Sequence, residues 1–290
     1  MRAKTGSRRK DAASLAARFG PDRGFVVGLA RALAGSLIFS LPLLMTMEMW
    51  QIGFYVSPWR LIVLLIVMIP LLTGLSYISG FEETERLRDD VIDAFVAIFV
   101  AAVLAAVILF IFRVITFEMP AGEIIGKIAI QTFPGSVGAM LARDQMSGAE
   151  EDRINRRRGS PQYPMELFLM AAGAVFLGLN VAATEEMVLL AHRMQPVHEI
   201  ALVLISLAVM HAFVYAVEFA GKPHLHPDTT FWGLFVRFTI VGYAIVLLVA
   251  LHLLWTFGRT DGAALAEVVS AAIVLGFPCA VGAAAARLIL

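Results

Sequence analysis

Eight long runs of apolar residues dominate the hydropathy pattern of this chain, and short polar connections separate them. A membrane-spanning α-helix needs about 20 mainly apolar residues to cross a hydrocarbon layer of about 30 Å. The pattern therefore predicts an all-α polytopic membrane protein with eight transmembrane helices. The expected helices cover residues 27–50, 60–80, 91–115, 121–142, 165–188, 198–219, 231–257 and 264–288.

The composition agrees with this prediction and excludes an ordinary soluble domain. Hydrophobic residues make up 59% of the 290 positions, charged residues make up 16%, and the mean hydropathy is +0.81. The single cysteine, Cys279, lies inside an apolar run, so the chain cannot form an internal disulfide bond. The net charge of +0 is uninformative, because basic residues gather at the front of the chain and acids gather between Glu82 and Asp93.

The distribution of Lys and Arg predicts the orientation, because cytoplasmic connections carry an excess of these residues. A basic N-terminal arm (residues 1–26), the connection around Arg86 and a polar linker (residues 143–163) all fall on one side of the membrane. The other side holds few basic residues, namely Arg60, Arg113, Arg193 and Arg259. We expect both termini to be cytoplasmic and the protein to lie in a bacterial inner (plasma) membrane.

Residues 27–142 and 164–290 resemble each other and predict two tandem repeats of four helices. A shift of 138 positions lays residues 31–81 on 169–219 with 11 identities, and a shift of 144 lays 121–143 on 265–287 with 8 identities. The second match includes Phe133 to Ala139 against Phe277 to Ala283. An even number of helices gives both repeats the same orientation, so an axis along the membrane normal should relate them.

Two carboxylates occupy equivalent positions in the repeats, Glu48 near the end of the first expected helix and Glu186 near the end of the fifth. An ionised carboxylate inside a bilayer is costly and is often functional. One interpretation is a duplicated site that takes up a cation or proton, with Glu185 as a further ligand. The other is that each acid only reaches the outer headgroups. Thr46 and Thr184 lie two residues earlier and should bond to backbone.

Further polar residues lie toward the expected cytoplasmic side. Glu82, Glu83, Asp89 and Asp90 could form an acidic inner vestibule, although acids are also typical of a solvated helix start. His211 could relay protons with Glu218 or could be a packing residue.

Asp93 aligns with Arg237, which suggests an ion pair between the repeats, as a clamp or as a gate. Pro134 and Pro278 either break their helices and free carbonyls for an ion site or only kink two packing helices.

The sequence contains few features typical of metal sites, enzymes or nucleic-acid binding. His224, His226 and Asp228 are weak candidates for a metal site, and a hydrophilic connection is the favoured explanation of them. Recognisable nucleotide-binding, zinc-protease and nucleophile-elbow motifs are absent, as is a basic face for nucleic acid. We therefore expect neither an enzyme nor a resident cofactor nor a nucleic-acid partner.

Three segments taken together resemble a bacterial family of integral membrane proteins with no assigned function. They run from Phe81 to Arg86, from Thr132 to Ala139 and from Asn180 to Met187. The resemblance covers most of the chain and implies a bacterial inner-membrane protein, but it supplies neither a site nor a substrate.

Two hypotheses of function follow. The first is a channel or transporter for a cation or proton that uses the duplicated carboxylates. The alternative is a non-transporting scaffold or sensor that acts through the basic arm and the linker. The expected partners are the lipid bilayer and an inorganic cation or proton, and a pore within one chain and a pore between copies of a homo-oligomer are equally compatible with the sequence.

Overall fold

The computed structural model describes residues 20–79, 87–145, 163–219 and 231–289, and all regular structure in these ranges is helical. We call the helices before residue 146 the first unit and those after residue 162 the second unit. The first unit contains α2 (Gly20–Leu44), α3 (Met47–Tyr55), α4 (Pro58–Ser79), α5 (Leu87–Ile111) and α6 (Ala121–Gln145). The second contains α8 (Tyr163–Ala182), α9 (Glu185–Arg193), α10 (Pro196–Phe219), α11 (Phe231–Leu234), the π-helix η1 (Phe235–Ile240), α12 (Val241–Thr256) and α13 (Leu265–Ile289).

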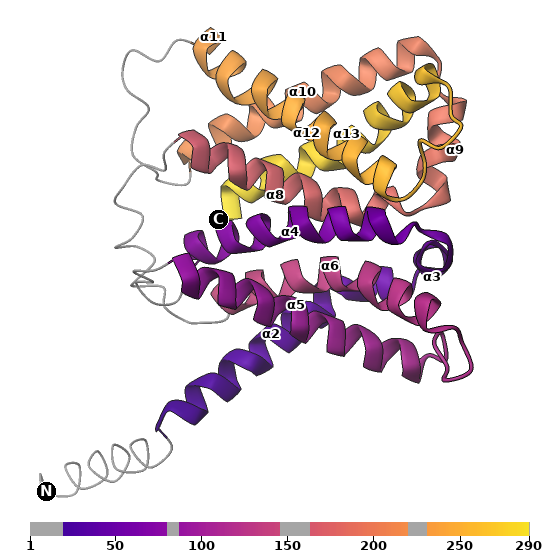
Figure 1. Ribbon diagram of the computed structural model, residues 1–290. Coiled ribbons are helices and arrows are strands. Elements are labelled where there is room, and N and C mark those ends of the chain that lie inside the picture. The colour runs from indigo at the N-terminus through magenta and orange to yellow at the C-terminus, as the bar shows by residue number, and fades with distance from the viewer. Residues whose placement is uncertain (1–19, 80–86, 146–162, 220–230, 290) are drawn as a thin grey trace, which may run out of the picture.

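Within these described ranges, eight segments are long and apolar enough to cross a membrane, which confirms the predicted all-α class with eight membrane helices. They begin at Val26, Pro58, Leu87, Ala121, Tyr163, Pro196, Trp232 and Leu265. Many large apolar side chains are exposed, among them Phe99, Phe117 and Leu248. A lipid-facing surface explains this exposure, because hydrocarbon solvates such side chains. Figure 1 shows the two units side by side, with α3, α9 and the tight connections gathered at one end. We call this the α3/α9 end.

Each unit is held together by close packing of its first and last long helices, α2 with α6 and α8 with α13. Glycines permit this approach, because a Cβ at Gly138 would lie 2.6 Å from the carbonyl oxygen of Gly35. In the second unit a Cβ at Gly282 would lie within van der Waals overlap of the carbonyl oxygen of Gly173. Small residues at helix contacts are the usual means of tight packing in membranes, where helices gain little from the hydrophobic effect.

The first expected helix, 27–50, is wrong at its end, because α2 stops at Leu44 and α3 begins at Met47. Thr46 adopts an extended backbone between them. The last carbonyls of a helix need new donors, and here side chains supply them. Thr46 Oγ1 donates to the carbonyl of Pro42 at 2.5 Å, Gln131 Nε2 to Leu43 at 2.9 Å, and Trp50 Nε1 to Leu44 at 2.9 Å.

The fifth expected helix, 165–188, is divided in the same way into α8 and α9. Thr184 is extended between them, and its hydroxyl donates to the carbonyl of Val181 at 2.9 Å. Arg259 donates from Nη2 to the carbonyl of Ala183 at 2.7 Å. Both threonines therefore bond to backbone, as the sequence predicted.

The expected helix breaks at Pro134 and Pro278 are not found, because α6 and α13 continue through them. A proline removes one backbone hydrogen bond of a helix but can be tolerated where neighbouring helices hold the segment. Pro134 follows buried Phe133, whose carbonyl accepts a hydrogen bond from Ser136 Oγ at 2.9 Å. The structure thus favours packing helices over freed carbonyls at an ion site.

The seventh membrane span differs from the others in containing η1, a π-helical turn. It packs between α12 and α10. The combined segment Phe231–Thr256 is one residue longer than α5, Leu87–Ile111. Such turns accommodate an extra residue within a helix and are frequent at functional sites.

Candidate functional site

The carboxylates predicted as ion ligands lie on the short helices of the α3/α9 end. Glu48 is in the first turn of α3 and is partly buried, whereas Glu185 and Glu186 are exposed in the first turn of α9. Helix α3 packs mainly against α6, and α9 packs against α13. The structure therefore keeps Glu48 and Glu186 in separate units and does not bring them together.

The predicted pair of Asp93 and Arg237 is not formed, because each side chain packs elsewhere. Asp93 accepts a hydrogen bond from Ser76 Oγ at 3.3 Å, and the same hydroxyl lies 3.1 Å from buried Asp90 Oδ1. Arg237 is exposed and stacks over the ring of Tyr163 at 4.3 Å. Ion pairing across the units is replaced by hydrogen bonding within the first and a cation–π contact within the second.

The other predicted residues have mixed outcomes. Asp89 is exposed at the start of α5, and His211 Nδ1 lies 2.9 Å from Thr239 Oγ1 in η1. Glu82, Glu83, His224, His226 and Asp228 lie outside the described residues, as does the side chain of Glu218. Among the residues that the structure describes, no group of three potential ligands could hold a metal ion.

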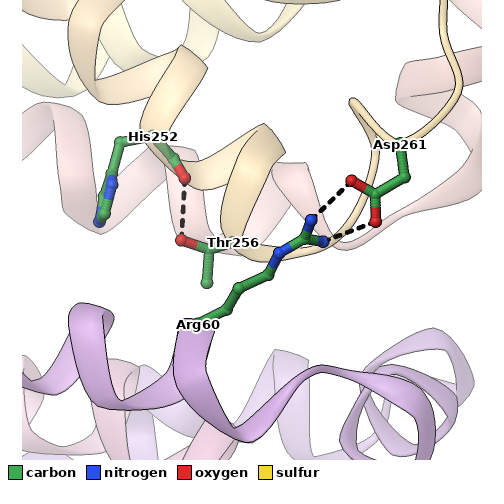
Figure 2. Close-up of polar contacts among 4 residues, drawn as sticks. All are labelled: Arg60, His252, Thr256 and Asp261. Atoms are coloured by element: carbon green, nitrogen blue, oxygen red, sulfur yellow. Dashed lines mark hydrogen bonds and ion pairs between the residues drawn. The ribbon is translucent and has the colours of Figure 1, made fainter.

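An ion pair that the sequence analysis missed joins the two units at the α3/α9 end. Arg60, in the first turn of α4, donates two hydrogen bonds to Asp261, in the connection between α12 and α13 (Figure 2). The distances are 2.8 Å from Nη1 to Oδ2 and 2.6 Å from Nη2 to Oδ1. Such a two-bonded geometry is the strongest arrangement of guanidinium and carboxylate.

The surroundings of the ion pair fix its geometry and its charge state. The guanidinium also lies over the ring of Trp255 at 5.3 Å. Gly258 has φ of +73°, and a Cβ there would lie 3.1 Å from Arg60 Nη1. Hydrogen bonds from Arg60 lower the pKa of Asp261 below its ordinary value. The carboxylate, whose side chain is 58% exposed, therefore stays ionised to a lower pH than an unpaired aspartate.

A cleft of about 590 Å³ opens beside this ion pair, between the two units. Volumes of about 300–1,000 Å³ are typical of small-ligand sites. One wall comes from the end of α3 and the start of α4, and the other from the end of α12 and the connection after it. The lining residues are Tyr55, Val56, Ser57, Trp59, Arg60, Trp255, Phe257, Gly258 and Asp261.

His252 lies one helical turn from Thr256 on α12, and its ring is directed towards α4 (Figure 2). Its Nε2 is buried and has no hydrogen-bond partner among the described residues. The ring stacks against Trp255, with centroids 6.0 Å apart. An imidazole can accept or donate a proton, so a protonatable group lies on α12 against Trp255, which lines the cleft.

Sequence reasoning could identify Arg60 and Asp261 only as isolated charges in short connections. They are 201 positions apart, and no spacing rule connects them. His252 lies in an otherwise apolar run and carries no local motif. The division of the chain into two units was the only available signal that the end of one unit meets the end of the other.

Comparisons with known proteins identify a family but no characterised relative. The family described as "Putative integral membrane protein (DUF2391)" matches residues 28–290. The chain belongs to this family. Neither the curated proteins nor the solved structures contain a match to the chain.

Proposed function

Since the chain belongs to a family of multi-pass integral membrane proteins, we propose that it is a channel or transporter for a cation or proton, built from two tandem four-helix units. The observation that carries the proposal is the cleft between the units, with the Arg60–Asp261 ion pair beside it and His252 stacked on Trp255 of its wall. Transporters built from repeats commonly place their substrate sites between the repeats.

Matching helix bounds support the tandem duplication. Adding 138 to the end of α2, to both bounds of α3 and to the start of α4 gives the corresponding bounds of α8, α9 and α10. Adding 144 to both bounds of α6 gives those of α13. Two unrelated helical bundles would not be expected to share these boundaries.

Matching backbone contacts give independent support. Gly35 and Gly138 become Gly173 and Gly282 under the two shifts, and both pairs are close contacts. The turn after α3 is closed by Val56 N donating to the carbonyl of Ile52, and the turn after α9 by Met194 N donating to that of Leu190. Both residues of the second bond lie 138 positions after those of the first.

Contacts between the described parts of the two units are few, which is what relative movement requires. Apart from the ion pair, they include an edge-to-face contact between Phe39 and Phe176, with centroids 4.9 Å apart. Phe168 of α8 also packs over Gly74 of α4. Interfaces of this kind permit rocking of one bundle against another, which is the usual basis of alternating access.

In this proposal the α3/α9 end faces the outside of an inner membrane and both termini are cytoplasmic, as the distribution of basic residues predicts. Glu48 and Glu186 then flank the external face as acids that attract cations, one in each unit. The substrate passes the cleft on its way across the membrane.

A flux assay on purified protein in liposomes tests the proposal. Gradients of protons, sodium, potassium, calcium and magnesium are imposed in turn, and movement of each ion is followed with a selective dye. The parent protein should move at least one of them. Arg60→Gln and Asp261→Asn should change the rate by about twofold or more, because each removes the ion pair beside the cleft.

Controls separate the cleft from general surface charge. Glu118→Gln removes an exposed acid at the same end and should leave the rate unchanged. Glu48→Gln and Glu186→Gln test the outer acids individually. A parent protein that moves none of the five ions would overturn the proposal and favour a scaffold or sensor.

A further inference from the structure

A row of polar side chains runs into the first unit along one face of α6. Glu123, Lys127 and Gln131 follow one another at intervals of four residues, which places them on the same face of a helix. Lys127 is 8% exposed and Gln131 is 1% exposed, inside a segment long and apolar enough to span a membrane. Ionisable residues at such depth are expensive and usually functional.

The charged members of the row compensate each other. Lys127 Nζ lies 2.6 Å from Glu123 Oε1, and the two side chains are 9% and 16% exposed. The same nitrogen donates to the carbonyl of Val114 at 3.2 Å and lies 3.9 Å from Met119 Sδ. The ammonium group therefore has a partner in each of three directions, and the site carries no net charge.

The inner part of the row carries polar atoms without a partner. Gln131 donates to the carbonyl of Leu43, but its Oε1 is buried and accepts no hydrogen bond in the described structure. Ser36 Oγ is also buried without a partner there, and a Cβ at Gly135, one turn beyond Gln131, would lie 2.8 Å from it. Buried polar atoms of this kind are normally satisfied by bound water.

The second unit keeps an acid, Glu267, in place of Glu123 but is apolar at the other corresponding positions. Under the shift of 144, Lys127 becomes Ala271 and Gln131 becomes Leu275, and under the shift of 138, Ser36 becomes Ala174. All three replacements are buried. Since the same helix contact forms without polar groups in the second unit, packing alone does not require them in the first.

We propose that Glu123, Lys127, Gln131 and Ser36 form a hydrated proton-binding site within the first unit. This inference rests on the proposed transport function and names the proton as the ion. A proton that enters at the α3/α9 end binds the Glu123 carboxylate, and Lys127 releases one to water held by Gln131 and Ser36. Proton transfer from Glu123 to Lys127 then restores the original pair.

The charges explain why a proton fits this site better than a metal cation. The Lys127 ammonium repels any cation that approaches the site, and it already neutralises the one carboxylate present. Sodium or potassium would need several further oxygen ligands. A proton needs only an acceptor atom and a connected hydrogen-bond path.

Substitutions guided by the second unit test the proposal in the same liposomes. Gln131→Leu installs the residue that the second unit carries and should slow proton flux by about tenfold or more, because the amide that holds the proton-accepting water is lost. Lys127→Arg keeps the positive charge but holds its proton too tightly to release it, so it should slow flux to a similar extent. Thr132→Val is the matched control, since among the described residues the hydroxyl of Thr132 bonds within its own helix, to the carbonyl of Ile128.

The outcomes distinguish this inference from the transport proposal. Folding of each variant is checked by size-exclusion chromatography and thermal unfolding before flux is measured. Normal proton flux in both Gln131→Leu and Lys127→Arg would overturn the inference and leave transport standing. So would a parent that moves sodium or potassium but no protons. A parent that moves none of the ions would overturn both.

Discussion

The close approach of α2 to α6 and of α8 to α13 makes a specific prediction about two glycines. In Gly138→Ala the new Cβ would lie 2.5 Å from Phe39 Cβ and 2.6 Å from the carbonyl oxygen of Gly35. In Gly282→Ala it would overlap the backbone of Gly173. Real Cβ atoms do not tolerate such distances to backbone, so the helices must separate.

The expected cost follows from the nature of these contacts. Overpacking a well-packed interface costs about 1–3 kcal/mol, and the upper part of this range applies because backbone atoms cannot rotate away. Both substitutions should therefore destabilise the protein by about 2–3 kcal/mol. The double variant should lose the sum of the two effects, because the contacts lie in separate units and share no partner.

Reversible unfolding in mixed micelles measures these effects, with Gly122→Ala as the control. Gly122 lies at the start of α6, and a Cβ added there would have no neighbouring atom within 4 Å, so alanine should be neutral or slightly stabilising. If Gly138→Ala and Gly282→Ala unfold like Gly122→Ala, the close helix contacts are incorrect. If only one destabilises, the units do not share the same packing.

Three further predictions concern single groups. Trp50→Phe removes the bond from Nε1 to the carbonyl of Leu44 and should cost about 0.5–1.5 kcal/mol in the same unfolding assay; an unchanged stability would mean that water replaces the indole. Arg60 lowers the pKa of Asp261 in the folded protein. The stabilisation by this ion pair is therefore fully present above the ordinary aspartate pKa of about 3.9, and it is lost only as pH falls through the lower pKa of the folded state. Carbon NMR of the labelled carboxyl should report this, and titration at or above the ordinary value would contradict it. Cys279 is fully buried, so a maleimide should label it only on unfolding; rapid labelling of folded protein would place the thiol at the surface.

The fold class was predictable because apolar length is a strong signal in a membrane, where every backbone group needs an internal partner. The division of residues 27–50 into two helices was not, since Met45 to Met49 continue the apolar run. Side chains distant in the sequence hold each break: Gln131, 88 positions away, bonds to the carbonyl of Leu43 at the end of α2, and Arg259, 76 positions away, bonds to that of Ala183 after α8. Local patterns carry no trace of such a bond.

The candidate sites were predictable only in part. The recurrence of Glu48 as Glu186 in the second repeat was visible in the sequence. The position of each acid on a separate short helix, α3 or α9, was not. In the sequence, Lys127 and Gln131 are two polar residues within the apolar run 121–142. The shift of 144 already aligns them with Ala271 and Leu275 in the sequence, but their burial and the unpartnered Oε1 of Gln131 come only from the described structure.

The π-helical turn η1 has a consequence for how the second unit diverged. Leu87, where α5 begins, lies 144 positions before Phe231, where the seventh span begins. Ile111, where α5 ends, lies 145 positions before Thr256, where that span ends, so the second unit has one extra residue here. If the two units arose by duplication, as we propose, one amino acid was inserted into this span of the second unit. The π-helical turn accommodates the insertion, so the later side chains of the span are not rotated by about 100°. Removing one residue between Phe235 and Ile240 should therefore restore an ordinary helix and leave the faces of α12 in place.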